Sequence, residues 1–268
     1  MLKDVTLGQF FPGNSLIHRL DPRTKLIALI FYIVALFTAE NWASYGLVFL
    51  FLATCIAVSK VPLRAFVRGM KPLLFILIFT GLLNLFLTPG GKVIFQYWKI
   101  IITEEGLMRA IFMVVRIILL ISGTFLLTYT TSPISLTDGL ESLLNPLKKL
   151  RMPVHELSMM MCIALRFIPT LIEETDKIIS AQKARGADFE SGSLMKRVKA
   201  LVPILVPLFI SAFRRADELA TAMECRCYHG GEGRTKMKLL RYKRSDYLSF
   251  LALPLLLAAV VVLVKIGL

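Results

Sequence analysis

The sequence lacks the short motifs that would give it catalytic chemistry of its own. It has no G-x-x-x-x-G-K-[ST] phosphate-binding loop, because Gly90-Gly91-Lys92 has no upstream glycine. It also has no H-E-x-x-H or paired-aspartate metal motif and no nucleophile elbow. The apolar segments lack the Asp, Glu and His residues expected of a proton relay. These absences argue against an ATPase, a hydrolase and a proton-coupled carrier, while a secondary carrier or channel and a membrane-bound enzyme stay open as alternatives.

Cysteine is also scarce, with four residues in the chain: Cys55, Cys162, Cys225 and Cys227. Cys55 lies in an apolar run and the other three lie in a region that we expect to be cytoplasmic, so we expect no structural disulfide. Cys225 and Cys227 are followed by a single histidine, His229, which is too sparse a set for a metal site. We therefore expect no metal and no cofactor.

What the chain has in excess is apolar sequence, since 56% of its 268 residues are hydrophobic. Uncharged runs cover 26–39, 41–59, 72–91, 117–137 and 247–264. A membrane-spanning helix needs about 20 apolar residues. The first run is shorter, and we expect Arg23 and Lys25 to snorkel to the membrane surface at its start. The sequence predicts an all-α integral membrane protein with about five transmembrane helices, joined by three amphipathic helices.

The formal net charge of +14 is unevenly placed and predicts the orientation of the chain. Lys and Arg gather in 1–25, in 60–71 and in 132–246, which the positive-inside rule assigns to the cytoplasm. We expect a multi-pass protein of the cell membrane with a cytoplasmic N-terminus. The predicted divisions are an N-terminal segment at 1–25, four spans within 26–131, a cytoplasmic region at 132–246 and a last span at 247–268. No basic stripe alternates with exposed aromatic residues, so we expect no nucleic-acid partner.

The first apolar run also bears on how the chain is targeted. It begins only at Leu26 and is preceded by Asp4 and Asp21, so we expect no cleavable signal peptide. Asp21 and Pro22 predict the helix start as N-cap and first helical residue. Arg116 is the one cation inside a span, and the sequence leaves open whether it snorkels outward, faces the bundle or marks a functional contact.

Amphipathic helices replace the apolar runs after Thr131. One begins at Pro133, in the membrane interface, and a second begins after Pro153 with an apolar stripe at helical spacing. A third covers 196–228. Proline disrupts helix interiors, so we expect a kink at Pro169 and breaks at Pro203 and Pro207.

The two longer amphipathic helices share an internal repeat. A shift of 41 positions aligns Asp176 with Asp217, Ala181 with Ala222 and Arg185 with Arg226. Each arginine stands between small residues, in Ala184-Arg185-Gly186 and Cys225-Arg226-Cys227. Small flanking residues let another protein's backbone come close, and a guanidinium suits a carboxylate or several carbonyl groups. The alternative is structural: the helix dipole favours a C-terminal arginine, and Gly186 is then a C-cap.

Three segments carry a resemblance to a known family. PGNSLIHRLDPRTKL near the N-terminus, LRFIPTLIEETDKIISAQKARG before the first arginine tip and RRADELATAMECRCY around the second resemble the transmembrane T component of energy-coupling factor (ECF) transporters. This resemblance implies a non-catalytic subunit that couples two cytoplasmic ABC-type ATPases to a membrane-embedded, substrate-binding S component for uptake of vitamins or transition-metal ions. It also implies that Arg185 and Arg226 dock on the ATPases, each with the small residues beside it. Cys225 and Cys227 depart from the usual Ala-Arg-Gly form.

Overall fold

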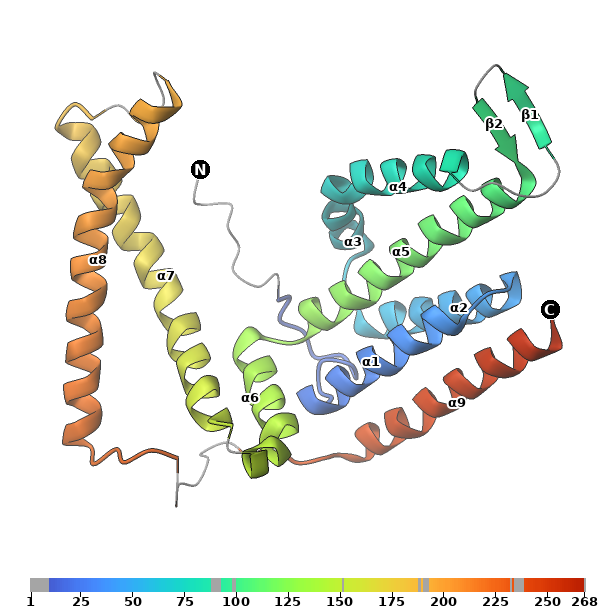
Figure 1. The fold of residues 1–268 in the computed structure, drawn as a ribbon. Helices are drawn as coiled ribbons and strands as arrows, with labels where there is room; N and C mark the ends of the chain where they lie inside the picture. Colours follow the sequence, from blue (N-terminus) through green and yellow to red (C-terminus); the bar gives the residue numbers. More distant parts are fainter. Residues whose placement is uncertain are drawn as a thin grey trace. The chain divides into compact units, whose positions relative to one another are not determined.

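The computed structural model describes residues 10–87, 93–97, 100–150, 152–187, 189, 193–231, 233 and 239–267. The chain divides into two compact units. One unit is a helical bundle formed by residues 8–140 and 240–268, and the other is formed by residues 141–239. Helix α6 (Pro133–Leu144) crosses the boundary between them in sequence. Figure 1 shows the elements of each unit.

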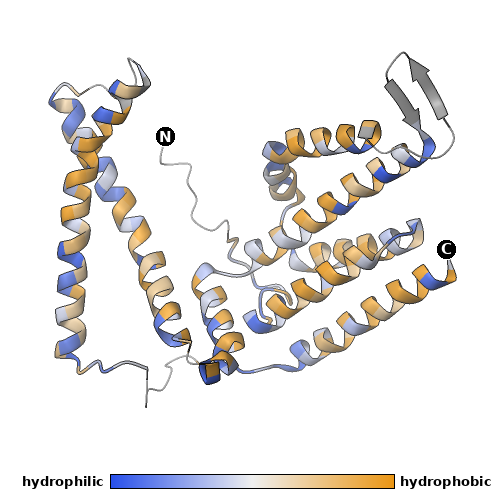
Figure 2. Ribbon diagram, in the orientation of Figure 1, coloured by the Kyte–Doolittle hydropathy of each residue, from blue (hydrophilic) through white to orange (hydrophobic). Residues whose placement is uncertain are grey.

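The bundle contains most of the apolar sequence. Its further elements are α1 (Pro22–Thr38), α2 (Trp42–Ser59), α3 (Leu63–Met70), α4 (Leu74–Leu87), α5 (Glu104–Thr130) and α9 (Arg244–Ile266), with a short 3-10 turn at Lys71–Leu73. Figure 2 shows that hydrophobic residues predominate along α1, α2, α4, α5 and α9. Many such side chains are exposed, among them Phe75 (77%) and Leu251 (71%). Apolar surface on this scale is compatible with lipid rather than water as the surrounding medium.

Five described helical stretches are long and apolar enough to cross a membrane: Trp42–Ser59, Leu63–Phe86, Glu104–Thr130, Val154–Ala184 and Arg244–Ile266. The prediction of an all-α membrane protein with about five apolar spans is therefore confirmed. The set differs by one helix from the predicted runs. Helix α1 has 17 residues, about 25 Å of helix, and is not among these five stretches, while α7 (Val154–Ala184) is one of them.

One small element was not predicted. Strands β1 (Val93–Tyr97) and β2 (Ile100–Thr103) form an antiparallel hairpin between α4 and α5. The sequence analysis expected no strand here, although Val93-Ile94-Phe95 and Ile100-Ile101-Ile102 are rich in residues that favour strands. Gly90 and Gly91, which end the third apolar run, lie outside the described residues.

The predicted start of α1 is confirmed. Asp21 is the N-cap, and its carboxylate accepts a hydrogen bond from the backbone N–H of Arg23 at 3.0 Å. Pro22 occupies the first turn, where its missing N–H breaks no helical hydrogen bond. Helix α1 then packs against α9, α5 and α2. Leu36, Val48 and Val260, from α1, α2 and α9, are fully buried at the centre of this cluster.

The expectation that Arg23 and Lys25 snorkel outward is wrong. Lys25 is only 6% exposed, and its ammonium donates to the Thr130 carbonyl at 2.8 Å and to Thr131 Oγ1 at 3.1 Å. Arg23 donates to the Leu240 carbonyl at 3.2 Å and lies over the Tyr242 ring. Both cations therefore bind the carbonyl-rich ends of neighbouring segments, where buried hydrogen bonds compensate their lost hydration.

The second unit contains two long helices, α7 and α8 (Leu194–Cys225), after a 3-10 segment at Asn145–Leu150. Helix α8 continues through Pro203 and Pro207, so the predicted breaks at these prolines are absent. Helix α7 likewise continues through Pro169. A proline removes one hydrogen-bond donor, and in these long helices packing along the rest of the helix outweighs that loss.

We expect the close packing of α1 against α5 to be sensitive to one added methyl group. A Cβ at Gly123 would stand 2.5 Å from Cε1 of Tyr32, whose hydroxyl is held by the Leu119 carbonyl at 2.9 Å. Gly123→Ala should lower the stability of the purified protein by about 1–3 kcal/mol because the site is already full. Thermal unfolding in detergent measures this change.

Gly46→Ala is the matched control, because nothing lies within 4 Å of its added Cβ in the middle of α2. Alanine is favoured over glycine in a helix by about 1 kcal/mol, so this variant should be as stable as the parent or more stable. Equal destabilisation by both changes would contradict the described packing.

Candidate functional site

The first candidate tip is the end of α7. Ala184 is the last helical residue, Arg185 is the C-cap, and Gly186 adopts the left-handed conformation with φ +84°. The backbone N–H of Gly186 donates to the Lys183 carbonyl at 3.0 Å, and that of Ala187 donates to the Gln182 carbonyl at 3.0 Å. This pair of bonds is a Schellman motif, which satisfies the last carbonyls of the helix. Gly186 thus ends the helix in the left-handed position directly after the C-cap residue Arg185.

The second candidate tip repeats this geometry at the end of α8. Arg226 is the C-cap after Cys225, and Cys227 takes the left-handed position with φ +56°. The N–H of Cys227 donates to the Glu224 carbonyl at 2.8 Å, and that of Tyr228 donates to the Met223 carbonyl at 3.0 Å. The sequence repeat therefore becomes a structural repeat, with an arginine at the C-cap of each Schellman motif.

The two motifs differ at the residue that follows the arginine. Glycine adopts a positive φ without penalty, whereas a residue with a Cβ loses roughly 1–2 kcal/mol there. Cys227 is one of two described non-glycine residues with a positive φ. The residue after each arginine is thus small because its backbone adopts a positive φ. Cys227 is strained in this conformation, whereas Gly186 is not.

All six residues of the tips, Ala184, Arg185, Gly186, Cys225, Arg226 and Cys227, are exposed. Within the described part of the chain neither guanidinium has an ion-pair or hydrogen-bond partner. Cys225 and Cys227 are free thiols, and no group of three or more His, Cys, Asp or Glu side chains among the described residues is placed to hold a metal ion. Both arginines are therefore accessible to another molecule.

A crossing of α7 over α8 fixes where the tips lie within this unit. Glu174 accepts hydrogen bonds from Ser211 and from Arg215, the latter at 3.0 Å, and Gln182 donates to the Pro203 carbonyl at 3.5 Å. Ascending positions on α7 meet descending positions on α8, so the helices run antiparallel (Figure 1). Arg185 lies eleven residues after Glu174, and Arg226 lies eleven residues after Arg215, which is roughly 16 Å along each helix. The two tips therefore lie at opposite ends of the helix pair.

The hydrogen bond from Gln182 to the Pro203 carbonyl is explained by the prolines of α8. Pro207 has no N–H, so it cannot donate to the carbonyl of Pro203 four residues earlier. The side-chain amide of Gln182 supplies a donor to that carbonyl from the neighbouring helix. This contact compensates one of the two prolines and helps to explain why α8 continues through them.

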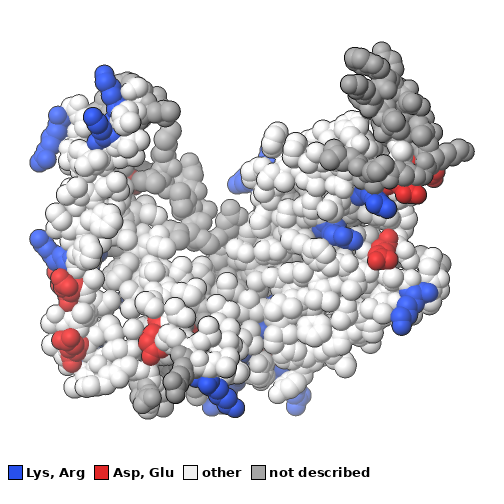
Figure 3. Space-filling view, in the orientation of Figure 1, with Lys and Arg blue, Asp and Glu red and all other residues white. Residues whose placement is uncertain are grey.

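Charge and apolar surface are separated on this pair of helices. Lys183, Arg185, Lys196 and Lys199 are all exposed near the end where α7 stops, and Figure 3 shows basic side chains gathered there. Along α8 an apolar face is exposed, including Val202 (51%), Phe209 (62%) and Phe213 (66%). The pair thus offers a polar end and an apolar side to other molecules.

Arg116, whose role the sequence left open, faces the bundle. Its Nε donates to the Tyr45 hydroxyl at 2.9 Å, and one terminal nitrogen donates to the Ala39 carbonyl at 3.1 Å. Ala39 is the C-cap of α1, so the cation stands at the negative end of that helix dipole. Arg116 therefore joins α5 to α1 and α2 as a structural contact.

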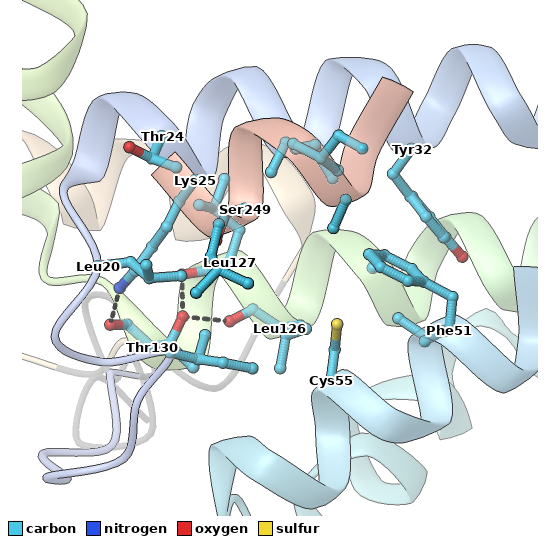
Figure 4. A pocket seen from close by; sticks show the side chains of 18 residues that line it. Leu20, Thr24, Lys25, Tyr32, Phe51, Cys55, Leu126, Leu127, Thr130 and Ser249 are labelled. Atoms are coloured by element: carbon cyan, nitrogen blue, oxygen red, sulfur yellow. Dashed lines mark hydrogen bonds between the residues drawn. The ribbon is translucent and has the colours of Figure 1, made fainter. Parts of the chain in front are cut away.

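The bundle also contains a partly open cavity of about 320 Å³ between α1, α2, α5 and α9 (Figure 4). Its lining is mainly aliphatic and aromatic, with Phe51 and Leu126 among the side chains shown. The polar groups of Lys25 and Tyr32 beside it are already bonded to the carbonyls of Thr130 and Leu119. The cavity is thus apolar, and its strongest polar neighbours are already used in hydrogen bonds that stabilise the fold.

The sequence analysis missed Asp246 as a structural residue. Its carboxylate is fully buried and accepts the backbone N–H groups of Asp21 at 2.8 Å and Lys243 at 2.7 Å. The second bond caps α9, and an aspartate three residues into a helix is a local signal for it. The bond to Asp21 joins residues 225 positions apart and has no local signal.

The features described so far define a class: a multi-pass helical membrane protein with a pair of amphipathic helices that end in exposed arginines. Comparison with known proteins agrees with this class. The family model described as cobalt transport protein (CbiQ) matches residues 13–237. The chain belongs to this family.

Several relatives carry the name energy-coupling factor transporter transmembrane protein EcfT. The protein of Acidaminococcus fermentans is 54% identical over 261 residues, covering 96% of this chain and 97% of the relative. That of Ruminiclostridium cellulolyticum is 54% identical over 248 residues, 92% of each chain, and that of Bacillus subtilis is 52% identical over 246 residues, 92% of this chain and 93% of the relative. The chain is thus the transmembrane component of an ECF transporter, a non-catalytic subunit, as the resemblance implied.

We expect the residue after each arginine to control how firmly the helix end is held. Gly186→Ala should weaken the first Schellman motif by roughly 1–2 kcal/mol, whereas Cys227→Gly should strengthen the second by a similar amount. Hydrogen exchange at the Ala187 and Tyr228 amides reports these changes directly, because these groups donate the closing bonds.

Exchange should become faster at Ala187 in the first variant and slower at Tyr228 in the second. Each tip is the internal control for the other, since its own exchange should not change. Faster exchange at Tyr228 after Cys227→Gly would contradict the assigned backbone strain.

Proposed function

We propose that the chain is the coupling scaffold of an ECF-type importer. It transmits the ATP-driven motion of two cytoplasmic ABC-type ATPase subunits to a membrane-embedded S component that binds the transported vitamin or transition-metal ion. The names of the relatives support the transporter, and the geometry of the tips supports the coupling role. The observation that carries the proposal is the pair of exposed arginines on equivalent helix ends, neither of which has an ion-pair or hydrogen-bond partner among the residues that the structure describes.

Docking follows from the chemistry of the tips. Each guanidinium projects from a helix end whose neighbours are small, so a groove on an ATPase can surround it closely. An acidic or carbonyl-lined groove would form charge-assisted hydrogen bonds with its fixed fork of donors. Because the tips lie at opposite ends of one helix pair, each ATPase takes one tip. Closure of the ATPase pair by ATP then draws the tips together and shifts the helices at their crossing.

The exposed apolar face of α8 has a place in this scheme. The side chains of Val202, Phe209 and Phe213 expose apolar surface that is unfavourable in contact with water. Their helical spacing is that of a contact face. We assign this face to the S component, whose tilting in the membrane would release the substrate inward. The proposed orientation places the N-terminus in the cytoplasm, on the evidence of the basic segments.

Loss of the arginines should weaken assembly stepwise. Arg185→Ala or Arg226→Ala removes a charge-assisted contact worth on the order of 2–5 kcal/mol and should leave partial assembly with lower uptake. The double variant should lose stable ATPase association, because each docked tip raises the effective concentration of the other. Co-purification of the two ATPases and uptake of a labelled vitamin through its cognate S component measure both effects.

Arg166→Ala is the control, because Arg166 is an exposed arginine in the interior of α7, between Leu165 and Phe167 rather than at a small-Arg-small tip. It should assemble and transport like the parent. Normal ATPase co-purification and uptake by the double variant would show that the arginines have only a structural role. Transport by this chain alone in liposomes, without ATPases, would instead favour the secondary carrier.

A further inference from the structure

The chain that follows the second tip folds back onto the start of α7. Gly231 lies five residues after Arg226 and packs against the imidazole of His155. A Cβ built on Gly231 would overlap Cδ2 of that ring and stand 2.8 Å from its Cγ. The adjacent Gly230 has nothing within 4 Å of such an atom. The close approach is therefore specific to Gly231, and only glycine fits it.

His155 is held in place by a carboxylate of α6. Its Nδ1 lies 3.2 Å from Oε1 of Glu141, and the hydroxyl of Ser158 donates to Oε2 of the same carboxylate at 3.1 Å. The Glu141 side chain is only 10% exposed and that of His155 is 23% exposed. A carboxylate that accepts bonds at both oxygens holds the imidazole at a defined angle. Displacement of Gly231 therefore acts on α6 through this pair.

Helix α6 makes a second close contact two residues before Glu141. Gly139 is buried, and a Cβ built there would stand 2.9 Å from Cβ of Pro22 and 3.3 Å from the backbone nitrogen of Arg23. These atoms belong to the first turn of α1 and cannot move aside as a flexible side chain can. The same short helix thus contacts His155 through Glu141 and the start of a bundle helix through Gly139.

We propose that Gly231, His155 and Glu141 are positioning residues that carry motion of the second tip to α6, and that α6 passes it to α1 at Pro22. When an ATPase moves Arg226, the five residues that follow it move as well, and Gly231 pushes against His155. The hydrogen bond between His155 and Glu141 then displaces α6. The inference rests on the proposed function, because it supplies the path from one docked tip to the bundle.

The test uses the full complex with the two ATPases and an S component that assembles with this chain, and the radiolabelled vitamin that this S component binds is the probe. Gly231→Ala leaves both tips intact, so ATPase co-purification and ATP hydrolysis should match those of the parent. The amount of vitamin imported per ATP hydrolysed should fall roughly 2- to 30-fold, the usual range for a residue on a coupling path. This ratio separates coupling from docking.

His155→Ala removes the same contact without introducing any steric overlap. This variant replaces Gly231→Ala in the test if Gly231→Ala lowers the yield of folded protein. It should lower the same ratio. The double variant should be no worse than the worse single variant, because both changes break one contact. Gly233→Asn is the matched control: it lies two residues further along, has φ +73°, which asparagine tolerates, and has nothing within 4 Å of the added atom.

The outcomes separate this inference from the proposed function. A normal ratio in Gly231→Ala or His155→Ala, additive losses in the double variant, or an equal loss in Gly233→Asn would overturn the relay alone. Failure of the parent chain to bind the ATPases would overturn the proposed function itself.

Discussion

The contact between Glu174 and the Ser211–Arg215 turn of α8 is the constraint on which the functional geometry depends. One carboxylate receives donors from two residues four apart, which lie on one face of α8. Together with the hydrogen bond from Gln182 to the Pro203 carbonyl, it fixes both the direction and the register in which the long helices cross. With that register fixed, the equal distances along each helix place the arginines at opposite ends. A slip along either helix would change where both tips lie.

The tips show how one sequence pattern can serve structure and binding together. The left-handed residue after each arginine ends the helix, and the C-cap position projects the arginine away from it. The structural and docking interpretations of the small-Arg-small motif are therefore compatible. Gly186 ends its helix without strain, whereas Cys227 does so with a positive φ that a Cβ disfavours.

Local signals predicted much of the fold and all six residues of the candidate tips. The apolar runs indicated membrane helices, Asp21-Pro22 indicated the start of α1, and the 41-residue repeat singled out Arg185 and Arg226. Contacts between distant segments were not predictable in this way. Asp246 receives the N–H of Asp21, and Lys25 turns inward to Thr130, because partners far away in sequence satisfy them. The continuity of α8 similarly depends on packing, and on a donor from Gln182.

The central claim is that ATP brings the two tips closer together. Ser180→Cys and Thr221→Cys place spin labels at repeat-equivalent, exposed positions, each five residues before its arginine, in a chain whose native cysteines are replaced by serine. The distance between the labels is measured by double electron–electron resonance in the assembled complex, without nucleotide and with ATP trapped. The account predicts a shift to shorter distances with ATP. An unchanged distance distribution in a complex that hydrolyses ATP and imports its vitamin would contradict it.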